Sequence, residues 1–283
     1  MDPRPTPPTR SFLVTGLLVL AASCAPGEPQ ADTDPTTLAE RCSANESGID
    51  VPDGFCAVMV AEGVTGARHI DVAPNGDVFV ARRNTTTGPA RTPVPGGVTV
   101  LRDTDGDGHA DVRESWGDNG GNDVIIDDGF VYFAPNDAVL RYPFESGALQ
   151  PAGPPDTLVS GLPDSRNHTA KSIELGGDGA LYVNIGSPSN ACMTEARTAG
   201  SPGQDPCPEL ETRAGIWRFD AGSTGLTQAD GTRFATGLRN VVALRAHPGE
   251  GTLYGVVHGR DQLDTMWPDV FDVEDNTEMP SEE

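Results

Sequence analysis

Basic side chains are scarce in this sequence of 283 residues, which has 19 lysine and arginine residues against 42 aspartate and glutamate residues, a formal net charge of -23. A chain this acidic repels phosphate backbones and anionic lipid headgroups, and it attracts divalent cations. We therefore expect no nucleic acid among its partners.

Long apolar runs and long helical patterns are also missing. The apolar run from Phe12 to Ala22 is too short to span a bilayer, and 34 glycines and 25 prolines would interrupt long helices repeatedly. No CxxC pair or Cys/His cluster occurs, so zinc and c-type haem have little support. These absences favour an all-β chain, and the length favours one main domain.

The first 24 residues have the pattern of a signal peptide. Arg4 and Arg10 precede the apolar run, which stops at AASC. This ending resembles a bacterial lipobox, with Cys24 as the lipidated first residue of an exported protein that is periplasmic or in the cell envelope. The lipid would then be its only membrane anchor. The alternative is an ordinary secreted protein in which Cys24 belongs to the discarded peptide.

A polar segment separates this signal from the main domain. Residues 25–50 begin APGEPQADTDPTT, which has too little apolar surface to offset the entropy of ordering it, so we expect a flexible tether. The domain then covers residues 51–283. In an oxidising compartment the four remaining cysteines form two local pairs, Cys42 with Cys56 and Cys192 with Cys207, although other pairings remain open.

Four segments of the chain share one pattern, a short apolar run, a turn and a second run with an aromatic residue. They are HIDVAPNGDVFVA, DVIIDDGFVYFA, SIELGGDGALYVN and VALRAHPGEGTLYGVV, with their aromatics at Phe79, Tyr132, Tyr182 and Tyr254. The NG and DG turns are typical of tight hairpins, and the period of these repeats is typical of propeller blades. We therefore predict four to five blades in this chain, either as a small ring or as the N-terminal part of a larger, truncated one.

The loop DTDGDGHADVRE has the spacing of an EF-hand calcium loop. Its candidate ligands are Asp103, Asp105, Asp107, Asp111 and Glu114 by their carboxylates and His109 by its backbone, with Gly108 at the sharp turn. A strand-like segment and a glycine-rich one flank the loop in place of two helices, so a structural calcium is expected. The alternative is a solvated acidic hairpin loop without metal.

Four further motifs carry a family resemblance. The segments NHTAKSIELGGDGALYVNIGSPSNAC, CPELETRAGIWRFDA, FATGLRN and HGRDQL, in this order, resemble the sorbosone dehydrogenase branch of the glucose/sorbosone dehydrogenases, which are six-bladed quinoprotein propellers. This resemblance implies oxidation of an aldose or a sugar aldehyde by pyrroloquinoline quinone (PQQ) with Ca²⁺, and transfer of the electrons to a respiratory acceptor.

The resemblance also implies roles for individual residues. His168 matches the general base, and a histidine suits that task because its pKa is close to neutral pH. Arg239 and Asn240 match the pair beside the quinone. The HGRDQL segment matches the calcium segment, with backbone oxygens near Gly259 and Arg260 and the carboxylate of Asp261 as ligands.

Some positions depart from the pattern of the glucose-oxidising branch. Asn167 precedes His168, and Ser187 stands where an aspartate would follow IG, which predicts weaker orientation of the histidine or a different substrate. The glutamine that the family pattern has near the GGND segment is missing, and Asn122 is the candidate substitute for it. Lys171 is a candidate contact for a carboxylate of the cofactor.

A rival interpretation belongs to another class of protein. In it, the chain is a noncatalytic, calcium-stabilised propeller lipoprotein that has lost the quinone site and binds a glycan or a protein partner. Ser187, the missing glutamine and the early end of the repeats favour this alternative.

Overall fold

The computed structural model describes residues 37–44, 47–165 and 167–272, so the predicted signal peptide, Cys24 and most of the predicted tether lie outside the described residues. One part of that tether is ordered as helix α1 (Leu38–Ala44). The disulfide between Cys42 and Cys56 and the ion pair between Arg41 and Asp107 attach it to the domain. Among the described residues, no helix is long and apolar enough to cross a membrane.

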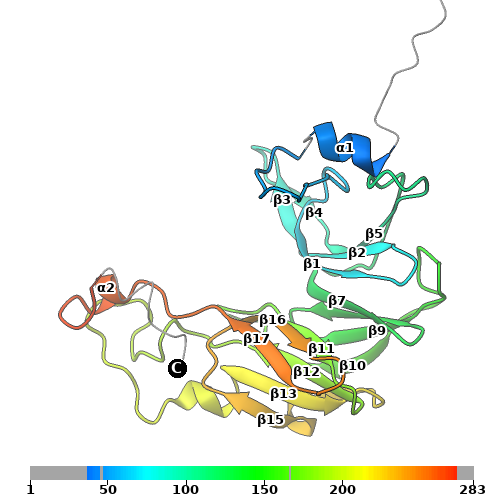
Figure 1. Ribbon diagram of the computed structural model, residues 1–283. Coiled ribbons are helices and arrows are strands. Elements are labelled where there is room, and N and C mark those ends of the chain that lie inside the picture. Colours follow the sequence, from blue (N-terminus) through cyan, green and yellow to red (C-terminus); the bar gives the residue numbers. More distant parts are fainter. Residues whose placement is uncertain (1–36, 45–46, 166, 273–283) are drawn as a thin grey trace, which may run out of the picture. The chain divides into compact units, whose positions relative to one another are not determined.

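The domain is built almost entirely of β-sheets, which follow one another along the chain (Figure 1). The first sheet holds β1 (Ala67–Val72), β2 (Val78–Arg82), β5 (Gly97–Arg102) and β6 (Val112–Trp116); the second holds β7 (Gly121–Asp127), β8 (Phe130–Pro135), β9 (Val139–Pro143), β10 (Asp156–Ser160) and β14 (Leu226–Thr227). The third holds β11 (Ile173–Leu175), β12 (Ala180–Ile185), β13 (Gly215–Asp220) and β15 (Thr232–Thr236), and the last holds β16 (Val241–Ala246) and β17 (Leu253–Val257).

Short elements complete the described chain. A separate hairpin joins β3 (Thr85–Thr87) to β4 (Thr92–Val94), two 3₁₀ helices cover Pro208–Glu211 and Gln228–Asp230, and helix α2 covers Leu263–Met266.

The four predicted hairpin repeats are confirmed. They are the pairs β1–β2, β7–β8, β11–β12 and β16–β17, all antiparallel. The DG turn between β7 and β8 has positive φ at both Asp128 (40°) and Gly129 (80°), as its hairpin type requires. The described residues thus form three full propeller-type blades and the first hairpin of a fourth, slightly fewer than the four to five blades predicted.

The apolar core lies between successive sheets. Phe79 of the first sheet and Phe133 of the second share one cluster of buried side chains, while Leu158 of the second and Trp217 of the third share another. A smaller cluster joins the third sheet to β16. Tyr254 is 58% exposed because the described residues place no further strand beside β17.

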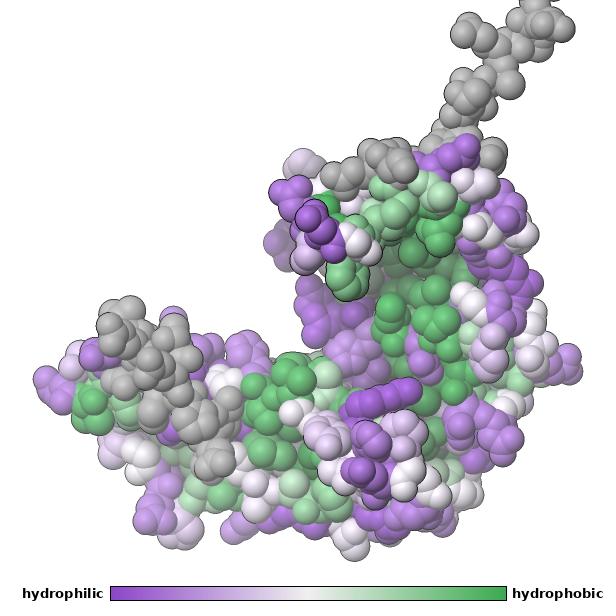
Figure 2. Space-filling model, viewed as in Figure 1, coloured by the Kyte–Doolittle hydropathy of each residue, from purple (hydrophilic) through white to green (hydrophobic). Residues whose placement is uncertain are grey.

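Both predicted disulfides are present, Cys42–Cys56 and Cys192–Cys207. The second one closes the long insertion between β12 and β13. Figure 2 shows hydrophobic residues gathered in the hollowed part of the face in view, with hydrophilic residues around it.

Candidate active site

Most of the predicted site residues lie at one end of the sheets, which we call the site end. It comprises the first residues of β1, β7, β11 and β16, the last residues of β2, β8, β12 and β17, and the loops beyond them. Hydrogen bonds between neighbouring sheets hold this end together: Arg68 Nε donates to Asn122 Oδ1 at 2.9 Å, and Val241 N donates to Asn184 Oδ1 at 3.1 Å. The opposite end, with the hairpin turns, is the turn end.

His168 lies in the loop before β11, half-buried, with a positive φ of 52°. Its Nδ1 lies 2.8 Å from the carbonyl oxygen of Ser187 and 3.3 Å from the Ser187 hydroxyl. A carbonyl oxygen can only accept, so Nδ1 carries the hydrogen and Nε2 keeps the lone pair. The Ser187 backbone therefore supplies the orientation that was expected to be weakened without an aspartate.

The surroundings of His168 keep its imidazole neutral. Burial is the largest cause that lowers its pKa below 6.5. The Ser187 hydrogen bond opposes this, whereas the nearby charges of Arg239 and His258 lower the pKa further and that of Asp261 raises it slightly. A neutral imidazole at neutral pH can accept a proton through Nε2.

Gly186 makes room for this histidine. A Cβ atom at Gly186 would lie 2.5 Å from His168 Cβ and 3.0 Å from Asn240 Oδ1. No residue with a side chain fits this position without moving His168 or Asn240.

Arg239 is 1% exposed, so its guanidinium lies inside the protein. Its Nε donates to the carbonyl oxygen of Asn190 at 3.0 Å, and its Nη1 donates to that of His258 at 3.1 Å. Its Nη2 lies 3.6 Å from the carboxylate of Asp261. The Arg239 carbonyl oxygen accepts from the Ser187 amide at 2.7 Å, and the Arg239 charge lowers the pKa of His168, so the two residues are neighbours; their predicted roles stay predictions.

Asp261 is held on both its backbone and its side chain. Asn190, fully buried, donates from Nδ2 to the Asp261 carbonyl oxygen at 2.6 Å and accepts from the Asp261 amide at 3.0 Å. The Asp261 carboxylate contacts Arg197 at 3.3 Å as well as Arg239. A cation on this carboxylate would meet two guanidiniums, so the arrangement does not fit the predicted role of Asp261 as a calcium ligand.

Asn240 and the HGRDQL segment offer donors and acceptors to the site. Asn240 Oδ1 accepts from Asn184 Nδ2 at 3.4 Å, whereas its Nδ2 makes no hydrogen bond within the described residues. The buried Nε of Arg260 has no partner there either. Gly259 and Arg260 are both half-buried.

Lys171 has a different setting from the one predicted. It is the only lysine of the sequence and is fully buried, and its Nζ donates to the carbonyl oxygens of Pro163 at 2.8 Å and Thr169 at 2.5 Å. Burial, followed by the charge of Arg213, lowers its pKa to about 7. The ammonium therefore holds the His168 loop and is not presented to a ligand.

Arg213, which sequence reasoning gave no role, completes this support. It is 7% exposed and donates to the carbonyl oxygens of Gly186 at 2.6 Å, Ser165 at 3.2 Å and Asn167 at 3.0 Å. Lys171 and Arg213 together bind four carbonyls of residues 163–169; we call the two side chains the cationic clamp. In the sequence, only the rarity of lysine indicated that Lys171 has a special role in this clamp.

Asn122 lies at the start of β7, where it is 4% exposed. Besides accepting from Arg68, it donates from Nδ2 to the carbonyl oxygen of Lys171 at 3.2 Å. It thus ties β1 to the chain beyond His168, and its predicted contact with a cofactor stays a prediction.

The acidic loop lies at the turn end, between β5 and β6. The carboxylates of Asp103, Asp105 and Asp111 gather within 4.8 Å of one another. The other predicted side-chain ligands do not join them, because Asp107 pairs with Arg41 at 3.6 Å and Glu114 accepts from Gln150 at 3.0 Å. His109 contributes a backbone amide that donates to Asp107. The full EF-hand set is therefore not assembled.

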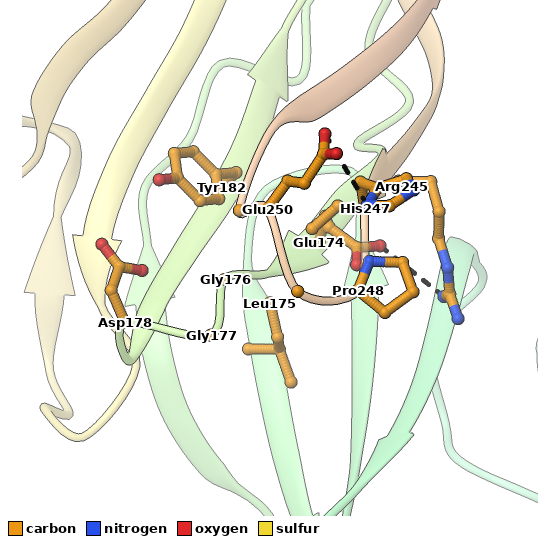
Figure 3. A pocket seen from close by; sticks show the side chains of 13 residues that line it. Glu174, Leu175, Gly176, Gly177, Asp178, Tyr182, Arg245, His247, Pro248 and Glu250 are labelled. Atoms are coloured by element: carbon orange, nitrogen blue, oxygen red, sulfur yellow. Dashed lines mark ion pairs between the residues drawn. The ribbon is translucent and has the colours of Figure 1, made fainter.

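A large cavity of about 640 Å³ also lies at the turn end, between the hairpin turns of the third and last sheets (Figure 3). Glu174 and Arg245 form an ion pair there at 3.8 Å, and His247 and Glu250 form another at 3.9 Å. The cavity contains none of the residues predicted for the site.

Comparison with known proteins agrees with a propeller-type all-β protein. The TrAA12-like family model matches residues 49–283, and the chain belongs to that family. No curated protein matches the chain.

Among solved structures, the PQQ domain of pyranose dehydrogenase from Coprinopsis cinerea, in its holo form, matches at 19% identity with a TM-score of 0.59 over 75% of this chain and 48% of that one. The iodide and calcium structures of a Trichoderma reesei carbohydrate-active enzyme of family AA12 match at 18% identity, with TM-scores of 0.59 and 0.58, over 75% of this chain and 50% of theirs. The chain spans about half the length of these solved structures. At such identities the likeness shows the fold.

Proposed function

We propose that this chain belongs to an exported, lipid-anchored, PQQ-dependent dehydrogenase that oxidises an aldose or a sugar aldehyde and passes the electrons to a respiratory acceptor. The observation that carries this proposal is the presence of two groups in one site. They are His168, whose Nε2 is free to accept a proton, and the buried guanidinium of Arg239. The similarity to the PQQ domain of pyranose dehydrogenase supports it.

The donors at the site end fit a cofactor rich in oxygen atoms. The Arg260 Nε is buried without a partner among the described residues, and Asn240 Nδ2 is unused there. Asn240 Nδ2 can donate to a carboxylate or carbonyl oxygen of PQQ, and the buried guanidinium of Arg239 adds positive charge beside it. The Asp261 carboxylate does not fit calcium, so no step is assigned to that metal.

The chemistry that PQQ supplies when bound is the acceptance of a hydride. His168 Nε2 takes the proton of the substrate hydroxyl as the C–H bond breaks, because Nδ1–H is fixed on the Ser187 carbonyl. The permanent positive charge of Arg239, close enough to His168 to lower its pKa, would stabilise negative charge that develops in the site. The cationic clamp and Gly186 keep the imidazole in place.

The experiment is a titration of the purified protein with PQQ, followed by the absorbance of the quinone and by its reduction on addition of aldoses. We expect Arg239→Ala to weaken uptake, and His168→Ala to leave uptake intact but lower turnover by at least about 100-fold. Matched controls are Arg218→Ala and His247→Ala, which change exposed side chains away from the site end. Turnover should fall with acid only below pH 6.5, because the pKa of His168 is lowered from that value.

A second candidate function is a noncatalytic propeller that binds a glycan or a protein partner. The observation that favours it is the engagement of Arg239 Nη2 and Arg197 with Asp261, which leaves the predicted calcium segment without a free carboxylate. Saturable binding of a glycan or a protein partner, together with no saturable PQQ uptake by the full-length protein, would favour this candidate over the dehydrogenase.

A further inference from the structure

A second cavity opens at the site end, between the first two sheets and the loop that carries His168. It has a volume of about 250 Å³ and no acidic residue in its lining, in a chain with 42 acidic residues. We call it the arginine cleft; its polar side chains are Arg68, Arg83, Asn84, Asn122, Asn136 and Thr169.

The two arginines supply the positive charge of the cleft, and Arg68 also borders a neighbouring cavity that contains Asp71 and Asp123. Arg68 donates from Nε to Asn122 Oδ1 at 2.9 Å, and both residues line the cleft. The guanidinium of Arg83 makes no hydrogen bond or ion pair within the described residues. No carboxylate among those residues pairs with either one. Most other arginines of the domain contact a carboxylate or a carbonyl oxygen, as Arg102 and Arg218 do.

The floor of the cleft is closely packed backbone. A Cβ atom at Gly120 would lie 2.2 Å from the amide nitrogen of Asn84, so only glycine lets the two segments approach. Asn84 is fixed as well, because its Oδ1 accepts from the amide of Gly96 at 2.8 Å, and its Nδ2 stays available. The cleft is therefore a formed cavity with fixed walls, and two exposed arginines line it.

The cleft borders the proposed catalytic histidine. Thr169 and Ala170, which directly follow His168, line it, and Asn122 binds the carbonyl oxygen of Lys171 at 3.2 Å. A ligand in the cleft would be a neighbour of the His168 loop. A volume of about 250 Å³ suits part of a sugar, since pockets for larger ligands begin near 300 Å³.

We propose that the arginine cleft binds the anionic group of a sugar substrate, a carboxylate as in a uronic acid or else a phosphate, so that the substrate class of the proposed dehydrogenase is an acidic sugar. Guanidiniums bind both groups through paired N–H donors, and the amides of Asn84 and Asn136 can hold neighbouring hydroxyls. The inference rests on the proposed function for the oxidation, but the binding itself requires no cofactor.

The test measures binding to the full protein without PQQ by calorimetry, with glucuronate, glucose 6-phosphate and glucose as separate ligands. We expect an anionic sugar to bind more tightly than glucose, and the preferred anion identifies carboxylate or phosphate as the source. Arg83→Ala should weaken anion binding about 10-fold to 100-fold and leave glucose binding unchanged. Arg83 is exposed, so this variant should fold, and Arg83→Lys should retain part of the affinity.

Arg218→Ala is the matched control, since it removes an exposed arginine from the turn end. Equal binding of glucose and both anions, or anion binding that Arg83→Ala does not change, would overturn the proposal. A loss of PQQ uptake in Arg83→Ala with unchanged anion binding would also overturn it, because the cleft would then serve the cofactor. If glucuronate binds but is not oxidised after PQQ is added, its oxidation is refuted and anion binding in the cleft stands.

Discussion

Different interactions hold the loops at the two ends of the sheets. At the site end, Lys171 and Arg213 are buried and bind backbone carbonyls of a long irregular loop. At the turn end, short hairpin turns suffice, and the charges there are mostly exposed, as in the ion pair of Arg218 with Asp178. An acidic chain can thus place some of its few cations inside the protein, where each orders several carbonyl groups.

The largest effect that tests this comparison is expected from Arg213→Met. The substitution leaves the carbonyls of Gly186, Ser165 and Asn167 without their buried donor, so the free energy of unfolding should fall by about 3 to 5 kcal/mol. Urea unfolding measures it, and Arg218→Ala at the turn end should cause no measurable change. If both variants lost the same free energy of unfolding, the two ends would not differ in the way described.

The next effect concerns pH and Lys171. Its pKa is about 7 in the folded protein against 10.5 when unfolded, so the folded state binds fewer protons between these values and stability should rise as pH increases from 7. The slope is at most about 1.4 kcal/mol per pH unit. Lys171→Met should remove it, as unfolding curves at pH 6, 7, 8 and 9 can show. A slope that persists in the variant would assign it to other groups.

The smallest effect is expected from calcium at the turn end. Three gathered carboxylates, of Asp103, Asp105 and Asp111, can bind Ca²⁺ only weakly, with Kd near the millimolar range of extracellular sites. Millimolar calcium should therefore raise Tm by only about 2 °C. Asp105→Asn should abolish the rise, and Asp178→Asn, an exposed acid at another turn, should not. A rise of the same size in both variants would indicate a nonspecific effect of the salt.

The hairpins and disulfides were predictable because their signals are local. A DG pair between two apolar runs specifies a tight turn by its own backbone preferences, and the turn at Asp128 and Gly129 follows it. The cysteines of each pair lie close in sequence, so nearby partners were the natural choice.

The site was predictable only in part, because its contacts depend on packing between sheets. His168 and Arg239 were identified from motifs, whereas the hydrogen bond of His168 to the Ser187 carbonyl depends on a loop beyond β12. Lys171 precedes a strand, where a lysine is usually solvated. Nothing local indicates that Pro163 and Thr169 surround its ammonium, or that Arg197 approaches Asp261.

The pairing of strand β14 determines when the second sheet can be completed. Leu226 and Thr227 follow β13 of the third sheet, yet they pair in parallel with Val159 and Ser160 at the outer edge of the second, and Gly225 N donates to Thr157 O at 2.8 Å nearby. The second sheet thus stays incomplete until the chain has been synthesised through residue 227. Because this contact is distant in sequence, we expect the second and third sheets to fold as one late, cooperative unit during translation.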